Sequence, residues 1–521
     1  MAEYLSPGIY MEEVNSGPRP IEGVGTAMAA FVGFAPGGPV NKPVLITNWS
    51  QYVETFGVAE NGGKRNPHVK GAYLSHAVYG YFLNGGGRCY VTAVGDPKAA
   101  AAQAPTPLQL PSKASKSVAS LSLLPKDAHA GDIEVEVKPP SGDQPADGTF
   151  TLRVKLGTVE ETYDNVSLGK GRGTKNVVET VNQTSKLVTV LEAQATGTLA
   201  ERAPEVGTYT LKQTKLAKAA PALPAVQAKN FRGEVAERSG IAGLEVAEDA
   251  TMLCCPDLMS AYEAGLIDRE GVKGIQTAMI NHCEQMGDRM AIIDPLPGLS
   301  PQEVKSWRKE TNYDSKFAAL YYPWIKVAGP DGQPISIPPC GHMAGIYARS
   351  DNERGGHKAP ANEVVRGALE TASQVTKGEQ DTLNPDGVNC IRSFSGQGIR
   401  VWGARTLSGD AAWRYINVRR LFNYVEKSIE RGTQWVVFEP NDADLWARVR
   451  RDVGAFLTGV WRDGALFGLT APEAFFVKCD EEINPPDVRD RGQLIIEIGL
   501  APVKPAEFVI FRLSQFAGGG A

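Results

Sequence analysis

The sequence has few of the residues from which metal centres and disulfide frameworks are built. Seven cysteines and six histidines are spread over 521 residues, and no two cysteines have the C-x-x-C spacing of a structural zinc site. A distribution this sparse does not fit a small secreted disulfide scaffold, so we expect free thiols and a reducing cytoplasm. The adjacent Cys254 and Cys255 are predicted to be small apolar residues of a core strand.

Positive charge, long apolar runs and nucleotide-binding loops are also lacking. A formal net charge of −5 argues against nucleic-acid binding, which needs a surplus of Lys and Arg. No segment reaches the roughly 18 apolar residues that cross a bilayer, and the N-terminus has no export signal, so we expect a soluble chain without direct membrane contact. The nearest approach to a P-loop, Gly57 to Lys64, has a displaced Lys and is followed by Arg65 instead of Ser or Thr. We therefore expect no nucleotide and no other cofactor.

The densest group of reactive residue types lies in "PPCGHMAGIYARSDNERGGHKAPANE". Cys340, His342 and His357 could serve a hydrolase or a metal enzyme, but their spacing fits no common ligand pattern. The alternative is a short helix that begins after Pro339, followed by a long polar loop in which charges such as Asp351 form a contact surface or a solvated turn. We favour this second interpretation and expect no enzyme.

Changes in composition divide the chain into segments. Tracts rich in Ala, Pro and Lys flank alternating, strand-like sequence such as "GTFTLRVKL", which predicts a β-rich module bracketed by linkers. Beyond it, strands and helices alternate, which implies a partly parallel sheet flanked by helices; Ser300 and Pro301 are expected to begin one of these helices. The predicted parts are an N-terminal extended arm (1–20), the N-terminal part of the core (21–96), an inserted outer module (97–239), an α/β core domain (240–385), a C-terminal domain (386–500) and a C-terminal arm strand with a flexible tail (501–521).

Both ends of the chain are strand-like and lack an evident partner. The first, "YLSPGIYMEEV", contains Pro7, which removes a backbone donor and keeps Ser6 extended. Unpaired strands are hazards unless covered, and strands donated to neighbouring copies would repeat into rings or helices. We therefore predict a homo-oligomer held by exchanged strands. The predicted contact residues are Tyr4, Leu5, Ile9, Tyr10, Met11 and Val14 in the N-terminal arm, and Phe508, Val509, Ile510, Phe511 and Leu513 in the C-terminal arm.

Several long segments resemble the contractile phage tail sheath family, which includes sheaths of R-type bacteriocins and of phage-tail-like injection systems. They include "YLSPGIYMEEV", "FLNGGGRCYVTAV", "PPCGHMAGIYARSDNERGGHKAPAN" and "GIRVWGARTLSGDAAWRYINVRRLFNYVEKSI". The resemblance covers residues 4–96 and 240–515 and is loose in the central module. It implies the multidomain, mixed α/β tail-sheath fold, with N- and C-terminal strands exchanged between subunits.

The resemblance also implies a mechanical role. Sheath subunits polymerise helically, as stacked rings around an inner tube, in an extended metastable state, and contraction drives the tube through a target envelope. The implied partners are other copies, the inner tube, and the baseplate and terminator or cap proteins, with assembly in the bacterial cytoplasm as part of a phage tail or a similar particle. Arg448 and Arg451 become candidates for contact with the tube. A static tube or capsid protein is the alternative polymer.

Overall fold

The computed structural model describes residues 20–59, 65–95, 107–126, 132–142, 146–169, 174–193, 197–212, 223–224 and 226–512. The six predicted contact residues of the N-terminal arm, and Leu513 of the C-terminal arm, lie outside this part of the chain. Among the helices that are described, none combines the length and apolarity needed to cross a membrane.

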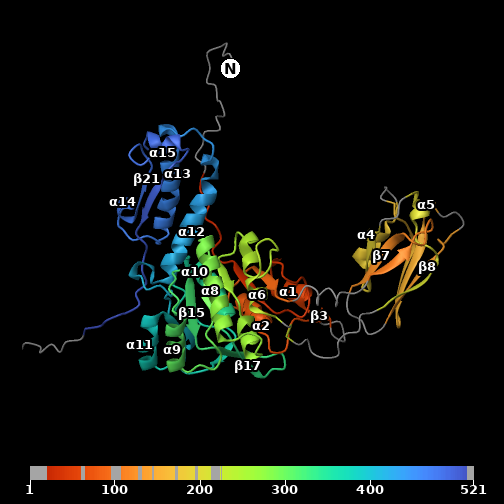
Figure 1. Cartoon of the computed structure of the whole chain (residues 1–521), viewed down its shortest axis with the longest axis horizontal. Helices are drawn as coiled ribbons and strands as arrows, with labels where there is room; N and C mark the ends of the chain where they lie inside the picture. Colours follow the sequence, from red (N-terminus) through yellow and green to blue (C-terminus); the bar gives the residue numbers. More distant parts are fainter. Residues whose placement is uncertain are drawn as a thin grey trace, which may run out of the picture.

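An eight-stranded sheet forms the centre of the body (Figure 1). Its strands follow the order β2 (Val44–Ile46), β5 (Cys89–Ala93), β1 (Ala29–Gly33), β13 (Met252–Cys254), β14 (Met290–Ile293), β15 (Ala318–Tyr322), β19 (Val388–Phe394) and β20 (Gly398–Val401). The strands from β5 to β19 run parallel, and both edge strands are antiparallel to their neighbours. The predicted mixed α/β fold with a partly parallel sheet is confirmed, and sequence on both sides of the module contributes to one sheet.

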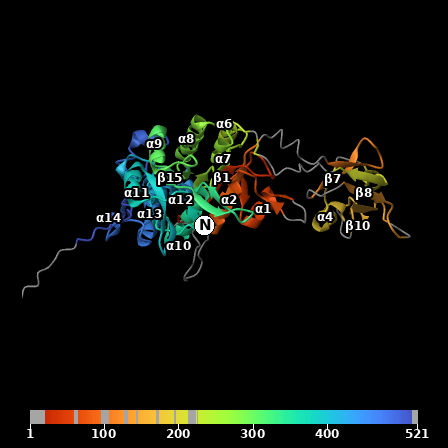
Figure 2. The ribbon, with the colours of Figure 1, turned by 90° about the horizontal axis from the view of Figure 1, so that it is seen from below.

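Helices cover both faces of this sheet, which is why strands such as β1, β14 and β15 are apolar throughout. In β1, Phe31 and Val32 point to opposite faces and join two different cores. The core of Phe31 is covered by α1 (Trp49–Phe56), α2 (Leu74–Leu83) and α10 (Cys340–Arg354). The core of Val32 is covered by α6 (Ala228–Arg232), α7 (Asp257–Glu263), α8 (Arg269–Met286), α9 (Pro301–Thr311) and α11 (Lys377–Leu383), as Figure 2 shows from below. Ser300 caps α9, as predicted.

Smaller elements complete the body. A three-stranded sheet has the order β17 (Pro334–Ile337), β16 (Ile325–Ala328) and β18 (Ala368–Thr371), and β3 (Val58–Ala59) pairs with β4 (Arg65–Asn66). Single 3₁₀ turns occupy Ala242–Val246, Asn384–Asp386, Ala411–Trp413 and Gln434–Val436.

A helix begins after Pro339, as predicted, but the prediction that it is short and soon gives way to a long polar loop is wrong. Helix α10 has 15 residues and is buried from Cys340 to Ser350. Its close fit against α2 depends on glycine: a Cβ at Gly341 would lie 2.3 Å from the Ala77 carbonyl oxygen, and one at Gly345 would lie 2.5 Å from that of Tyr81. The polar residues His342, Arg349 and Ser350 of this helix are internal, which single-sequence polarity does not reveal.

The inserted module is β-rich, as predicted, and has a core of its own. Its first sheet has the order β10 (Val159–Val166), β9 (Phe150–Leu156), β8 (Ile133–Lys138) and β12 (Gly207–Leu211), and its second has the order β11 (Val188–Glu192), β7 (Ala119–Pro125) and β6 (Leu108–Pro111). Helices α4 (Val177–Thr184) and α5 (Leu199–Arg202) accompany them. Every buried residue of this core lies between Leu110 and Leu211, so the module closes on itself.

The C-terminal part of the chain forms a separate apolar cluster. It comprises α12 (Ile416–Gly432), α13 (Ala443–Arg462), α14 (Ala471–Ala474), β21 (Phe475–Lys478), α15 (Pro486–Asp490) and β22 (Glu497–Leu500). Long helix α12 begins beside the central sheet and ends within this cluster, so it links the two parts (Figure 1).

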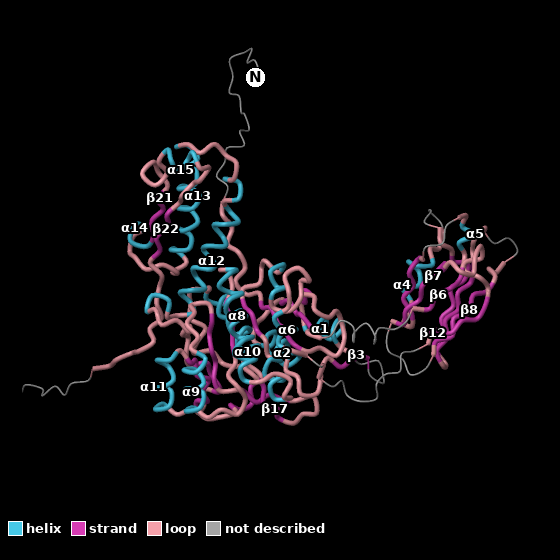
Figure 3. The backbone as a smooth tube through the Cα atoms, in the orientation of Figure 1, coloured by secondary structure: helices cyan, strands magenta, loops and turns pink. Residues whose placement is uncertain are grey.

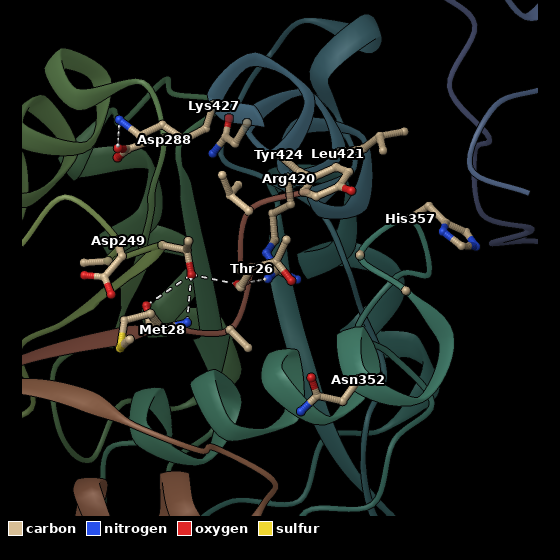
Figure 4. A pocket seen from close by; sticks show the side chains of 18 of the residues that line it. Thr26, Met28, Asp249, Asp288, Asn352, His357, Arg420, Leu421, Tyr424 and Lys427 are labelled. Atoms are coloured by element: carbon tan, nitrogen blue, oxygen red, sulfur yellow. Dashed lines mark hydrogen bonds and ion pairs between the residues drawn. The ribbon is translucent and has the colours of Figure 1, made fainter. Parts of the chain in front are cut away.

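A buried ion pair attaches α12 to the body. The Arg420 guanidinium donates to both carboxylate oxygens of Asp351 on α10, at 2.8 and 2.5 Å, and lies over the Tyr347 ring. It also donates to the Thr26 carbonyl oxygen at 2.9 Å, just before β1 (Figure 4). We expected Asp351 to lie in a polar loop, at a contact surface or a solvated turn. Instead it is half of an internal ion pair.

A cleft of about 760 Å³ lies beside this attachment. Residues 24–28 line it, with Thr26 and Met28 labelled in Figure 4. The Val24 N–H donates to the Ser428 hydroxyl at 3.1 Å. The segment that leads in from the N-terminal arm is therefore fastened both to α12 and to the central sheet.

Because α2 and α10 pack so closely, one added methyl group at their contact should lower the free energy of unfolding. Gly341→Ala places a Cβ against backbone that cannot move aside, so the free energy of unfolding should fall by about 1–3 kcal/mol. In α13, Gly459 has no atom within 4 Å of its hypothetical Cβ, so Gly459→Ala should be neutral or stabilising by up to about 1 kcal/mol. Chemical denaturation of the unassembled chain measures both; an equal effect of the two changes would contradict the packing argument.

Removal of one partner of the buried pair should be costly, because it leaves the other charge uncompensated. Asp351→Asn is expected to lower the free energy of unfolding by about 3 kcal/mol. The matched change Asp487→Asn removes an exposed carboxylate 3.9 Å from Arg491 and should change it by less than about 0.5 kcal/mol. Thermal or urea unfolding of the two variants side by side tests this, and a mild effect of Asp351→Asn would refute the importance of the pair.

Candidate assembly site at the chain ends

The segment that follows β22 lies against its own body for several residues. The Ala501 N–H donates to the Ala474 carbonyl oxygen at 2.9 Å, and the Val503 N–H donates to that of Ala465 at 3.1 Å. The Asn417 side chain also donates to the Val503 carbonyl oxygen, at 3.2 Å. The predicted C-terminal arm, 501–521, is therefore attached to its own chain over its first residues.

Glu507 is the last attached residue of this segment. Its carboxylate accepts two hydrogen bonds from the Arg405 guanidinium, at 2.8 and 2.7 Å, one from the Tyr415 hydroxyl at 3.0 Å and one from the Asn384 amide at 2.8 Å. Partial burial raises the pKa of Glu507, but the hydrogen bonds from Arg405, Asn384 and Tyr415 outweigh burial, so its pKa is lowered overall. The carboxylate is thus held in its charged form.

Residues 508–511, directly after Glu507, are apolar and exposed. The side chains of Phe508, Val509, Ile510 and Phe511 are 71%, 70%, 78% and 85% exposed. These residues form no strand, and no hydrogen bond or ion pair joins residues 508–512 to another described residue. Figure 3 shows the stretch as a loop that runs away from the body. Four of the five predicted C-terminal contact residues therefore lie together on a segment that the single chain does not cover.

A small sheet in the C-terminal part has room for additional strands. Strands β21 and β22 pair antiparallel, from Phe475 opposite Leu500 to Lys478 opposite Glu497. In the described part of the chain neither strand pairs with a third strand, and an isolated bridge from Leu466 to Pro502 continues past the end of β22. Phe476 on β21 is exposed and lies over its cross-strand partner Gly499, on a face of the sheet, and Ile495 just before β22 is also exposed. Edges without a third strand are where strands from other chains pair.

Arg448 and Arg451 both lie on α13, with their side chains exposed to solvent. Arg448 lies 3.4 Å from a Glu439 carboxylate oxygen and over the Trp435 ring, and Arg451 donates to Asp452 at 3.1 Å. The pair of Arg448 with Glu439 is exposed on both sides and therefore weak, so the Arg448 guanidinium can exchange it for another contact. The Asp452 carboxylate that Arg451 contacts is buried. The two predicted tube-contact residues thus share one accessible helix.

Two of the three candidate enzyme residues, Cys340 and His342, are buried within α10. Cys340 is fully buried at the start of α10, where burial raises the pKa of its thiol and so disfavours the nucleophilic thiolate. Burial lowers the pKa of His342 to about 4, while His357 lines the cleft beside α12. Within the described ranges, no group of three or more His, Cys, Asp and Glu side chains is arranged to hold a metal ion.

The sequence analysis did not identify the residues that hold Glu507. Arg405 follows β20, Tyr415 precedes α12 and Asn384 follows α11, so the three come together only in the fold. The one local signal was the position of Glu507 immediately before the apolar run "FVIF".

Comparison with known proteins agrees with this arrangement. The sequence matches the phage tail sheath protein central domain over residues 247–407 and the phage tail sheath C-terminal domain over residues 408–516, together more than half of the chain. It is 25% identical to the tail sheath protein of Burkholderia phage BcepMu, over 98% of this chain and 96% of that protein. It is 30% identical to the tail sheath protein of Vibrio phage KVP40, but that match spans only 33% of this chain and about a quarter of the phage protein.

Solved structures resemble the whole chain. The sheath of the anti-feeding prophage in its contracted state is 25% identical, with a TM-score of 0.58, over 98% of this chain and all of that one. The contracted sheath complex of the extracellular contractile injection system PVC gives the same TM-score at 24% identity, over 99% of both chains. With two sheath domains matched and the sheath fold reproduced along its length, this chain belongs to the phage tail sheath protein family.

Proposed function

We propose that this chain is the protomer of a contractile sheath, which polymerises helically around an inner tube in an extended metastable state and contracts to drive that tube through a target envelope. The proposal rests on one observation. The apolar segment from Phe508 to Phe511 is exposed in the single chain, directly after Glu507, which is bound to Arg405. The contracted-state sheaths among its structural relatives support the contractile role.

The C-terminal arm of one copy pairs with an open edge of the β21–β22 sheet of another. Strand addition gives the arm the backbone hydrogen bonds that it lacks and covers its apolar side chains. The N-terminal arm, with Tyr4, Leu5, Ile9, Tyr10, Met11 and Val14, makes the equivalent contact at the other end of the chain. Because each contact joins different surfaces of two copies, it repeats into stacked rings.

Other partners follow from the same role. The exposed face of α13 with Arg448 and Arg451 contacts the inner tube, and baseplate and terminator proteins cap the ends of the sheath. The inserted module, which closes its own core, projects outward. Assembly takes place in the bacterial cytoplasm, within a phage tail or a phage-tail-like particle, and the chain acts mechanically and not as an enzyme.

Deletion of residues 508–521 should give a folded chain that forms no filaments. The deletion starts after Glu507, so every contact of the body described above remains. The matched control deletes only Ala517–Ala521, a short end rich in glycine, and should still assemble. Circular dichroism verifies the fold and negative-stain electron microscopy counts filaments; normal filaments from the longer deletion would contradict arm donation.

A charge within the N-terminal arm should weaken assembly without unfolding the body. In an extended segment Ile9 and Met11 share one face, so Ile9→Asp places a carboxylate in the apolar site of the acceptor. We expect the concentration needed for filament formation to rise at least about tenfold. Glu12→Gln, on the opposite face, should leave it unchanged. Sedimentation of assembled protein over a concentration series measures both, and equal behaviour of the two variants would count against the donated-strand contact.

A further inference from the structure

The carboxylate of Glu507 is held by groups that are themselves fixed to the centre of the body. The Nη1 group of Arg405 donates a hydrogen bond to the Asn384 carbonyl oxygen at 3.1 Å. The Arg405 backbone N–H donates to the Asn389 side-chain oxygen at 2.7 Å. Asn389 lies in β19 and donates to the Leu320 carbonyl oxygen of β15 at 3.1 Å. The hydrogen bonds to Glu507 therefore continue into two adjacent strands of the main sheet.

Glu507 also lies at the point where a segment attached to the body is followed by an exposed apolar segment. On its N-terminal side, the last backbone attachment is at Val503. On its C-terminal side, the apolar side chains from Phe508 to Phe511 are exposed. Without the Glu507 contacts, the unattached segment would begin after Val503 and would be four residues longer, which adds about 13 Å of reach.

We propose that Glu507, Arg405, Tyr415 and Asn384 form an anchor that fixes where the donated C-terminal strand leaves the body. The anchor is a set of positioning residues, since none of them belongs to the exposed apolar segment. A fixed exit keeps the strand near the position from which a neighbour can bind it, whereas a longer free segment spreads it over a larger volume and lowers its effective concentration. The proposal rests on the proposed function, in which residues 508–513 pair with another copy.

The anchor can be opened in the full-length chain by Glu507→Ala, which removes all four hydrogen bonds. Arg405→Lys keeps the charge but cannot make both bonds of the planar guanidinium. The matched control is Glu310→Gln, at a bidentate pair with Arg269 on the outside of α8 and α9, with distances of 2.9 and 2.5 Å. All three variants should fold normally.

Two measurements test the anchor. The seven native cysteines are all buried, so a nitroxide attached through Lys504→Cys reports on the segment just before Glu507. In the unassembled chain, the label should become mobile with Glu507→Ala and Arg405→Lys but not with Glu310→Gln. The concentration needed for filament formation should rise at least about tenfold with Glu507→Ala, because the residues that the anchor had ordered must then be ordered on assembly, and ordering even one residue changes an equilibrium constant by about that factor.

The outcomes separate the anchor from arm donation itself. If deletion of residues 508–521 abolishes filaments but Glu507→Ala changes neither the mobility of the label nor the assembly concentration, the anchor is refuted and arm donation stands. If the deletion leaves filaments intact, arm donation is refuted, and the anchor with it. A mobile label with unchanged assembly also refutes the anchor, because the exit point would then not matter for pairing.

Discussion

A single strand-forming segment cannot pair its own backbone N–H and C=O groups or bury its apolar side chains by itself. The architecture of the chain follows from this constraint. Residues 508–512 are exposed in a protein whose main sheet is covered by helices on both faces. Polar edge strands can remain in water, but a stretch such as "FVIF" gains most from burial in a sheet. The molecule presents this stretch at the end of a segment whose preceding residues are firmly attached, which is the arrangement that an intermolecular strand requires.

The body is built to keep its shape while its ends make contacts. Carboxylates that follow two adjacent parallel strands reach the start of the covering helices: Asp257 accepts the Leu74 N–H of α2 at 3.2 Å, and Asp294 accepts the Cys340 N–H of α10 at 3.0 Å. The pair between Arg420 and Asp351 then fixes α12 to α10. Under the proposed function, a body held together in this way moves as one piece, and a change in the arrangement of copies falls on the segments between them.

The two ion pairs, one buried and one partly buried, have different roles. Arg420 and Asp351 are both almost fully buried, and their pairing orients one part of the fold relative to another. Arg405 and Glu507 are less buried and lie where the chain leaves the fold. Burial of a charged pair contributes little net stability, but it specifies geometry strongly when each charge has several hydrogen-bond partners. Geometry is what a protomer of a regular polymer must reproduce in every copy.

Much of the fold was accessible from the sequence, and the exceptions have a common cause. The apolar strands, the cap at Ser300 and the β-rich module follow from local patterns, and local patterns identified them. Helix α10 was predicted too short because its polar residues suggested solvent, whereas Asp351 finds its partner 69 residues away. The partners of Glu507 are up to 123 residues away and lie in two connecting segments, the turn after α11 and the loop between β20 and α12. No pattern in one sequence records such pairings, because they exist only after the chain has folded.

The central claim is that the segment after Glu507 completes a sheet in another copy of the chain. A cryo-electron microscopy map of the assembled filament, at a resolution that traces side chains, tests it most directly. The account predicts that residues 508–513 of each copy pair with an edge of the β21–β22 sheet of a neighbour, while Glu507 remains bound to Arg405 of its own chain. A map in which this segment folds back onto its own body, with no strand shared between copies, would contradict it.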